Sequence, residues 1–399
     1  MKRDVVIAGG GPAGLMLGYL FARAGIEVTV LEKHADFLRD FRGDTVHPST
    51  LEVLYELGLI DEFLQRPHQE VTELAGVVNG HDIKLVDFRH LPTHCKFLVL
   101  VPQWDFLDFL ATKARAFPNF DLRMQTEVVD LVEDGNAIRG VVIKTKAGRE
   151  ELTCDLVVAA DGRKSIVREK AGLVIQDYGA PIDVLWMSVR KGADTVQRFG
   201  HIAPGKIAVT LDRGDYWQVA YVIPKDGITA IKERGLETLR NNITELAPQL
   251  NEHMNDVKDW DAVRLLTVRV DRLREWYKPG LLCIGDAAHA MSPIGGIGIN
   301  LAIQDAVAAA NILTKPLRAH SLNTNDLKKV QARRELPTKL TQNAQVFMQN
   351  RVMVNVLQAT TSTGLPIFLR LINSWARLRR IPARLVGIGV RPEHYRSPE

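Results

Sequence analysis

The sequence has few cysteines, no excess of charge of one sign and no long apolar run. Its 399 residues include three cysteines, Cys95, Cys154 and Cys283, which are far apart and lie among apolar residues. They predict buried, reduced thiols rather than a disulfide framework or a metal site, and hence a cytoplasmic location. The 51 basic and 47 acidic residues nearly balance, which argues against a nucleic-acid partner. No apolar run reaches the roughly 20 residues of a membrane-spanning helix.

The first 31 residues favour a strand, a helix and a second strand. Residues 4–8 are rich in β-branched side chains, and residues 13–24 carry apolar side chains at helical spacing before Gly25 ends the helix. Residues 26–31 again favour a strand. The sequence therefore begins with a β-α-β unit, which is the first part of many nucleotide-binding folds.

The turn between the first strand and the helix contains Gly9, Gly11 and Gly14 in the pattern G-x-G-x-x-G. In dinucleotide-binding folds the first glycine permits a tight turn, the second lets backbone N–H groups approach a pyrophosphate, and the third allows close packing. Glu32 ends the second strand, where an acid accepts from a ribose hydroxyl. The unit alone fits FAD and NAD equally. The binding residues predicted in this unit are Gly9, Gly11, Pro12, Ala13, Gly14, Glu32 and Lys33.

Two further motifs follow apolar strands. Residues 156–160 precede the string D-G-R-K-S-I-V-R at 161–168, and residues 281–284 precede G-D at 285–286. The second motif continues into a proline- and glycine-containing loop at 293–300, which opens a helix. Free N–H groups at the start of that helix favour negative charge nearby.

The order and spacing of these motifs resemble those of the single-component (class A) FAD-dependent aromatic hydroxylases, a family that includes para-hydroxybenzoate hydroxylase and the ubiquinone-pathway hydroxylases. The resemblance implies that Asp286 binds the flavin ribityl chain and that Arg42 lies near the pyrophosphate. Gln103 stands where the family usually carries Arg or Gln. The cofactor-binding residues implied beyond the glycine turn are Arg42, Gln103, Asp161, Gly162, Gly285, Asp286, Gly298, Ile299 and Asn300.

The resemblance also implies a reaction. NADPH or NADH, bound transiently, would reduce FAD, and a flavin C4a-hydroperoxide formed with O2 would hydroxylate an aromatic, quinone-like or other electron-rich small molecule. Pro293, Gly295 and Gly296 would border the reacting part of the flavin. The group that helps to deprotonate a phenol stays open among four candidates, which are Tyr216, Tyr221, His47 and His201.

Simpler explanations and other functions compete with this interpretation. Asp161 can serve only as a helix cap, and for His289 we favour a core imidazole bonded to a backbone carbonyl over a catalytic role. A prenyl-lipid (geranylgeranyl-type) reductase of the same fold would saturate double bonds without oxygen, and a non-catalytic protein would only bind flavin. A halogenase would carry W-x-W-x-I-P where this sequence has V-A-Y-V-I-P at 219–224.

The predicted fold is α/β, with a Rossmann-like FAD-binding domain of the glutathione-reductase type, an inserted and mostly antiparallel substrate sheet, and C-terminal helices. Alternating apolar residues at 206–211 and 216–223 indicate strands of the inserted sheet. The predicted FAD-binding domain is discontinuous and comprises residues 1–70, 101–173 and 271–315. The substrate domain comprises residues 71–100 and 174–270, and residues 316–399 form the helical C-terminal region.

Residues 367–389 combine apolar side chains with five arginines, which are Arg370, Arg377, Arg379, Arg380 and Arg384. A basic amphipathic segment can lie on a membrane surface. More often its apolar side packs on the protein itself while the arginines stay in water, and we expect that arrangement. A homodimer is a further possibility that the sequence leaves open.

Overall fold

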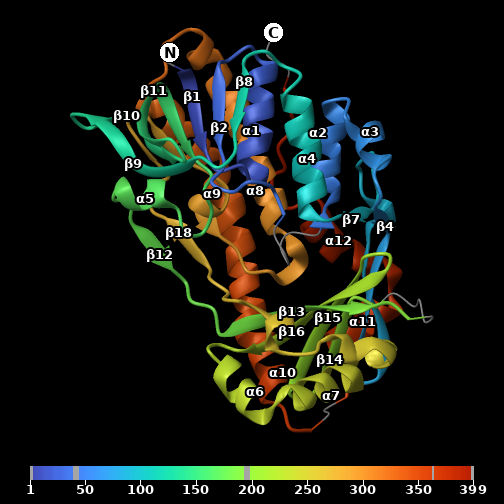
Figure 1. Ribbon diagram of the computed structural model, residues 1–399. Coiled ribbons are helices and arrows are strands. Elements are labelled where there is room, and N and C mark those ends of the chain that lie inside the picture. The colour runs from blue at the N-terminus through green and yellow to red at the C-terminus, as the bar shows by residue number, and fades with distance from the viewer. Residues whose placement is uncertain (1–2, 39–44, 193–197, 362–363, 397–399) are drawn as a thin grey trace.

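The computed structural model describes residues 3–38, 45–192, 198–361 and 364–396, and it has two large sheets at opposite ends of the molecule (Figure 1). The N-terminal strand belongs to a mostly parallel sheet, drawn at the top of Figure 1, and a second sheet lies at the bottom. The long helix α9 (Thr324–Phe347) extends from the first sheet towards the second. Arg42 lies outside the described residues.

The parallel sheet brings the predicted motifs to one edge. Its parallel strands are, in spatial order, β8 (Phe120–Arg123), β2 (Val28–Leu31), β1 (Arg3–Ala8), β11 (Gly148–Ala159) and β20 (Leu281–Cys283). Because parallel strands end at the same edge, the residues that follow β1, β2, β11 and β20 meet there. Ligands of open α/β sheets bind at this carboxyl edge.

Alternation along β1 explains how the sheet is covered. Val5 and Ile7 belong to a core formed with helices α1 (Pro12–Arg23), α4 (Gln103–Ala114) and α8 (Gly298–Arg318). Val6 and Ala8 point to the other face, into a core with the hairpin β9 (Glu127–Asp134) and β10 (Ala137–Thr145). Both faces of the sheet are therefore buried, as a parallel sheet requires. Helix α5 (Ile166–Lys170) follows β11.

The second sheet has the spatial order β17 (Arg264–Leu266), β13 (Ile182–Arg190), β16 (Tyr216–Pro224), β15 (Lys206–Asp212), β14 (Gly200–Ala203), β5 (Glu73–Val78) and β6 (His81–Asp87). All its pairs are antiparallel except β14 with β5. As predicted, strands from residues 71–100 join this sheet. The last strand of this segment, β7 (Leu98–Leu100), does not join the second sheet. It pairs with β3 (Thr45–Val46) and β4 (Gln69–Val71) in a separate small sheet.

Helices cover the side of the second sheet that faces away from the first. Residues 174–270 were expected to be rich in strands, but they also form α6 (Ile228–Arg234), α7 (Leu236–Leu246) and a 3-10 segment at Pro248–Asp256. In Figure 1 these helices lie below the sheet. Trp217, Val219 and Tyr221 of β16 pack on α7, whereas Ala220 belongs to a cluster on the opposite face. The sheet thus has a closed outer face and an inner face towards the cofactor edge.

The remainder of the chain is helical, as predicted. After α9, a π-helical segment at Met348–Met353 leads into α10 (Val354–Gln358), which contacts β15 and β16. Helices α11 (Ile367–Ser374) and α12 (Arg380–Gly387) then contact β6. The predicted boundary between residues 315 and 316 lies inside α8, so α8 belongs to both predicted parts. Helix α2 (Pro48–Glu56) and the short α3 (Ile60–Leu64) complete the fold near α8.

Candidate functional site

The three glycines of the first turn are required for different reasons. Gly9 has φ +105°, and a Cβ there would lie 2.3 Å from the Ala160 carbonyl oxygen of the neighbouring strand connection. A Cβ on Gly14 would lie 2.0 Å from the Gly9 oxygen. A Cβ on Gly11 would meet no described atom within 4 Å. Packing therefore explains Gly9 and Gly14, and the open space at Gly11 fits close approach by a ligand.

The N-terminus of α1 points its unpaired N–H groups into that space. No side chain of the described residues caps this helix, whose N-cap is Gly11. Pro12 occupies the first turn, where its missing N–H costs nothing. The N–H groups of Ala13 and Gly14 and the helix dipole are thus available to a pyrophosphate.

Glu32 lies beside this turn at the end of β2. Its Oε2 accepts a hydrogen bond from Gly10 N at 3.0 Å, and its Oε1 accepts from His34 N at 3.0 Å. Lys33, the next residue, is exposed. The carboxylate is therefore fixed at the edge of the cofactor space, where it fits the predicted role of accepting from ribose.

The D-G-x-x-S-x-V-R motif is tied to the G-D motif by Arg168. This buried guanidinium donates to Ala287 O at 3.1 Å and to Arg163 O at 2.7 Å, so one side chain joins both loops. Ser165 caps α5 by accepting from Arg168 N at 3.0 Å. Asp161 Oδ2 also accepts from the α5 residue Val167, at 3.3 Å, as in the simpler capping interpretation. Gly162 adopts φ +84° in the turn between them.

Burial raises the pKa of Asp161, although Ser165 and backbone N–H groups oppose that shift. Asp161 comes two residues after the end of β11, and its backbone lies beside Gly9, because a Cβ on Gly9 would be 2.9 Å from Asp161 Cα. Asp161 therefore combines the capping role with a position at the cofactor edge.

Asp286 has a partner that the sequence did not reveal. Arg163 Nε donates to Asp286 Oδ2 at 3.0 Å, and the carboxylate is about one third exposed. Gly285 adopts φ +58°, and a Cβ there would lie 3.2 Å from Ala13 Cβ at the start of α1. The G-D turn thus lies against the glycine turn, and Asp286 is held by a cation but still faces solvent space. The position of Arg163 directly after Asp161-Gly162 is the signal that could have identified it.

His289 belongs to a buried ionic network. Its Nε2 lies 2.6 Å from Asp305 Oδ2, which also accepts from Gly285 N at 3.0 Å. Arg334 Nε donates to the other carboxylate oxygen at 3.0 Å. Burial opposes ionisation of Asp305, but His289 and Arg334 outweigh it and hold the pKa of the carboxyl below its usual value. His289 is therefore structural, but its partner is a carboxylate and not the backbone carbonyl that we expected.

The loop before α8 combines glycines in the left-handed region with an open helix end. Gly295 and Gly296 adopt φ +77° and φ +63°, and a Cβ on Gly296 would lie 2.3 Å from Thr45 Oγ1. A Cβ on Gly298 would meet no described atom within 4 Å. No side chain of the described residues caps α8, which has 21 residues. The first N–H groups of α8 can therefore face a negatively charged edge of a bound ring.

Three glutamines, on α9 and the π-helical segment after it, hold residues 290–294 at the start of this loop, and sequence reasoning missed them. Gln345 Nε2 donates to Ser292 O at 3.1 Å and to Ile294 O at 3.0 Å. Gln342 Nε2 donates to Ala290 O at 2.9 Å. Gln349, in the π-helical segment, donates to Ser292 Oγ. Pro293 is thus held between fixed neighbours at the cofactor edge.

Asn300 and His47 join the loop to α2 and α12. Asn300 Oδ1 accepts from Thr50 Oγ1 at 2.7 Å and from His47 N at 3.2 Å, so its side-chain oxygen is hydrogen-bonded within the protein. His47 Nδ1 lies 2.7 Å from Val386 O, which can only accept, so this nitrogen carries the proton. Burial lowers the pKa of His47 to about 4. The ring lies at the loop, but a base this weak does not support a role in phenol deprotonation.

Two of the other three candidate bases, Tyr221 and His201, lie away from the cofactor edge. Tyr221 is buried in the core under α7, where burial raises the pKa of its hydroxyl to about 12. His201 hydrogen-bonds to Thr210 and Gln249 within the second sheet and its outer cover. Tyr216 begins β16, on the same side of the strand as Gln218 and Ala220, and stays a candidate. The expectation of catalytic roles is corrected for Tyr221 and His201, because β16 and β14 direct these side chains to the outer face.

The last two predicted positions give less information. Gln103 is the first residue of α4 and is partly exposed. Ile299 is buried in the first turn of α8, within the main core. Gln103 is therefore accessible from solvent, whereas the Ile299 side chain serves packing and only its backbone can face the loop.

The arrangement fits FAD. Two helices present uncapped N-termini at one edge. Among the motif glycines at 9, 11, 14, 162, 285, 295, 296 and 298, Gly11 and Gly298 have neither a close neighbour for an added Cβ nor a positive φ. Glu32 and Asp286 place carboxylates at the ends of two strands, where they suit the ribose and ribityl hydroxyls. Binding at this edge spans both motifs, as the long FAD molecule requires.

The sequence and the fold match known flavoproteins. Residues 2–344 match the family model described as an FAD binding domain. The chain is 36% identical over 357 residues to 6-methylpretetramide 4-monooxygenase of Streptomyces rimosus, covering 88% of this chain and 84% of that protein. It is 30% identical over 321 residues to rifampicin monooxygenase of Streptomyces venezuelae, covering 76% of this chain but only 62% of that longer protein.

A solved structure agrees with the fold. The p-nitrophenol 4-monooxygenase PnpA of Pseudomonas putida superposes with a TM-score of 0.76 at 23% identity, covering 95% of this chain and 93% of that one. At this identity the likeness concerns the fold alone. Together with the family match, it places the cofactor motifs in a known architecture. The chain therefore belongs to the FAD binding domain family, among the class A flavoprotein hydroxylases.

Proposed function

We propose that the protein is an FAD-dependent monooxygenase that uses NAD(P)H and O2 to hydroxylate an aromatic or other electron-rich small molecule. The observation that carries the proposal is the Pro293–Gly298 loop, which is held by three glutamines and ends in an uncapped helix at the cofactor edge. The relatives named for monooxygenation of 6-methylpretetramide and rifampicin support this reaction class.

Bound FAD would accept a hydride from NAD(P)H and activate O2. The chain supplies the surroundings for that chemistry. The N-terminal N–H groups of α8 stabilise negative charge on the ring edge, at a helix end where partial positive charge is greatest. Glu32 and Asp286 bind sugar hydroxyls, and the glutamine-held loop fixes Pro293 at the reacting side.

We further propose that the inner face of the second sheet receives the substrate. Trp186, Ala220 and Val209 are register partners on three neighbouring strands and form an apolar row. Trp186 and Val209 also pack in a cluster with Val386, whose carbonyl contacts His47 at the loop. An aromatic ring fits such a surface, because planar apolar groups stack on it without leaving polar atoms unpaired.

At the end of this face, Gln218 is the residue that would recognise a polar group of the substrate. Gln218 is buried on the same side of β16 as Ala220, two residues away, and its Oε1 accepts from Arg213 Nε at 3.0 Å. The Arg213 guanidinium and the Gln218 amide can bind a phenol or carbonyl oxygen of the substrate. This pair would bind the substrate oxygen in place of the three candidate bases His47, His201 and Tyr221.

The deciding experiment measures NAD(P)H oxidation, O2 uptake and product mass with purified holoenzyme and a panel of phenols and polycyclic aromatic compounds. A product heavier by one oxygen, formed with matching consumption of O2, supports hydroxylation. NAD(P)H oxidation that saturates a double bond without O2 uptake supports the prenyl-lipid reductase. Flavin that stays oxidised with every compound supports a non-catalytic flavin-binding protein.

Three further expectations remain proposals. The division into a discontinuous FAD-binding domain, a substrate domain and a helical region is supported by the two separate sheets. A cytoplasmic location is supported by Cys95, Cys154 and Cys283, which are buried and form no disulfide with one another. Burial also raises the pKa of Cys95 to about 11, so this thiol is unreactive at neutral pH. A homodimer stays a prediction that sedimentation measurements test.

A further inference from the structure

The C-terminal helices expose large apolar side chains that we expected to be covered. On α11, α12 and the turn between them, six of these side chains are 45–75% exposed, namely Ile367, Phe368, Leu371, Trp375, Ile381 and Leu385. Residues 367 and 371 lie on one side of α11, Trp375 directly follows the end of that helix, and residues 381 and 385 share one side of α12. We call these six residues the C-terminal apolar face. An outward cluster of this kind marks a site of interaction.

The same helices carry only positive charge. The sequence has no Asp or Glu between residues 352 and 392. Four arginines there are exposed, namely Arg370, Arg377, Arg380 and Arg384. None of the ion pairs found among the described residues involves any of these four. The apolar face is therefore accompanied by unneutralised cations.

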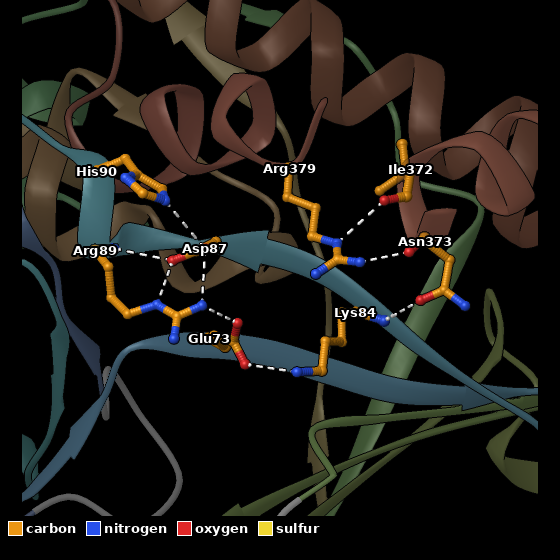
Figure 2. Close-up of polar contacts among 8 residues, drawn as sticks. All are labelled: Glu73, Lys84, Asp87, Arg89, His90, Ile372, Asn373 and Arg379. Atoms are coloured by element: carbon orange, nitrogen blue, oxygen red, sulfur yellow. Dashed lines mark hydrogen bonds and ion pairs between the residues drawn. The ribbon is translucent and has the colours of Figure 1, made fainter. Parts of the chain in front are cut away.

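The nearby acids are already paired with other cations (Figure 2). Glu73 binds Lys84 Nζ at 3.1 Å and also pairs with Arg89. Asp87 pairs with Arg89 at 2.9 Å, and its hydrogen bonds from Arg89 lower the pKa of the carboxyl despite burial. Asp82 pairs with Arg198 at 2.7 Å. These carboxylates therefore do not neutralise the arginines of α11 and α12.

Polar contacts fix which side of the helices faces outward. Lys84 N on the edge strand β6 donates to Asn373 Oδ1 at 3.1 Å. Arg379 Nε donates to Ile372 O at 3.1 Å, and its terminal nitrogen donates to Asn373 O (Figure 2). These contacts attach the end of α11 to the sheet and satisfy its last carbonyls.

Helix α12 is attached by close packing. A Cβ on Gly387 would lie 2.7 Å from Leu91 and 3.2 Å from Phe88, so this side of the helix lies directly on the protein. Ala383, one turn earlier, is fully buried in the same cluster. The inner sides of both helices thus contact the rest of the protein, and the C-terminal apolar face lies on their outward side.

We propose that the C-terminal apolar face docks the protein on an anionic lipid surface. Aromatic and aliphatic side chains on the outward side of short helices can enter the headgroup region, and arginines beside them attract lipid phosphates. A second copy of the chain fits less well, because a symmetric contact would bring the arginines of both copies together. The contact is peripheral, since the apolar window in the helix at Ile294–Arg318 is 67% buried in the core.

Lipid docking would bring the surface close to the proposed site. Leu385 of the apolar face directly precedes Val386, whose carbonyl accepts from His47 beside the glycine loop. One helix therefore links the apolar face to the site. An apolar aromatic compound dissolved in the lipid surface would be concentrated on the side of the protein that carries α12.

The test measures co-sedimentation of the FAD-loaded protein with vesicles. Vesicles of phosphatidylcholine containing phosphatidylglycerol are compared with vesicles of phosphatidylcholine alone. We expect binding to the anionic vesicles that weakens as salt is added. The double variants Trp375→Ser/Ile381→Ser and Arg377→Gln/Arg384→Gln should each lower the partition coefficient about tenfold or more.

Matched controls use exposed residues elsewhere. Val174→Ser removes an exposed apolar side chain from β12 (Ile175–Asp177) and its approach, and Arg139→Gln removes an exposed cation from β10. Both should bind like the parent protein. Equal binding to neutral vesicles, no binding to either kind, or unchanged binding of the double variants would overturn the proposal. A dimer that dissociates in the variants without vesicle binding would assign the face to a second copy.

Discussion

Gln345 and Ser292 are joined by two hydrogen bonds, much as neighbouring strands are joined in a sheet. Ser292 N donates to Gln345 Oε1 at 3.1 Å, and Gln345 Nε2 donates to Ser292 O at 3.1 Å. Both residues are buried, so water cannot replace either bond. A side chain of α9 thus fixes the residue that precedes Pro293, and the position of the reacting loop depends on a helix outside the cofactor motifs.

Replacing Gln345 should separate cofactor binding from coupled turnover. In Gln345→Ala, three backbone groups, Ser292 N, Ser292 O and Ile294 O, lose a partner. This loss costs about 1–3 kcal/mol and lets the loop move. We expect FAD to remain bound while the fraction of NAD(P)H converted into hydroxylated product falls several-fold and hydrogen peroxide rises. Asn343→Ala, an exposed position on the same helix, is the control. Unchanged coupling in Gln345→Ala would contradict the role assigned to this side chain.

The glycine turn allows a matched pair of substitutions. Gly11→Ala adds a methyl group where no described atom lies within 4 Å, whereas Gly14→Ala places one 2.0 Å from the Gly9 oxygen. The first variant should fold, with a stability change within about 1 kcal/mol, and should bind FAD at least tenfold more weakly. The second should lose the fold itself. Thermal unfolding of the apoprotein and titration with FAD distinguish these outcomes, and normal FAD affinity in Gly11→Ala would falsify the pyrophosphate assignment.

Local patterns explain why the cofactor edge could be predicted from the sequence. Each motif follows an apolar strand. Because parallel strands end at one edge of a sheet, the positions of the motifs after these strands predict that the motifs meet there. Gln345 and Arg334 could not be found in this way. Their partners Ser292 and Asp305 lie 53 and 29 residues away in the chain. A glutamine on a helix has the same local pattern whether it faces water or a buried loop.

Tyr221 shows a second limit. The alternation along β16 correctly separates Trp217, Val219 and Tyr221 from Gln218 and Ala220. It does not tell which of the two sets faces the cofactor, because helices in the inserted region cover one side. Those helices were themselves missed, since α7 lies within a segment dominated by strand patterns. The proposed substrate face can therefore be assigned only from the arrangement of both sheets.

His47 should make stability depend on pH. Its pKa is about 4 in the folded protein against 6.5 for an ordinary histidine, because burial disfavours the charged ring. The unfolded state therefore binds a proton more readily between these values, so stability is complete above about pH 6.5 and falls as the pH drops towards 4. The loss reaches about 3 kcal/mol by pH 4.

Substitution of His47 isolates this contribution. His47→Asn keeps a donor for Val386 O and removes the titration, so denaturant unfolding should show a smaller loss of stability from pH 6.5 to 4. His81→Asn, at an exposed histidine, should leave the slope of the parent protein unchanged. An identical slope in parent and His47→Asn would show that other groups cause the acid sensitivity.

The stability of the protein should depend strongly on the charge of Asp305. It bonds to His289, Arg334 and Gly285 N, and it is completely buried. In Asp305→Asn, Glu393, at 3.3 Å, is the one ionic partner of Arg334 that remains among the described residues. Removing one partner from a buried ionic network costs about 3–5 kcal/mol, so the unfolding midpoint should fall sharply.

The comparison variant is Asp82→Asn, which removes an exposed carboxylate paired with Arg198. Exposed pairs contribute little because water and salt screen them, and we expect its midpoint to match the parent. Asp305→Asn should also weaken FAD binding, since the Gly285 N contact orients the turn that carries Asp286. A variant that keeps both its midpoint and its FAD affinity would show that the Gly285 turn is held by Arg168 and not by Asp305.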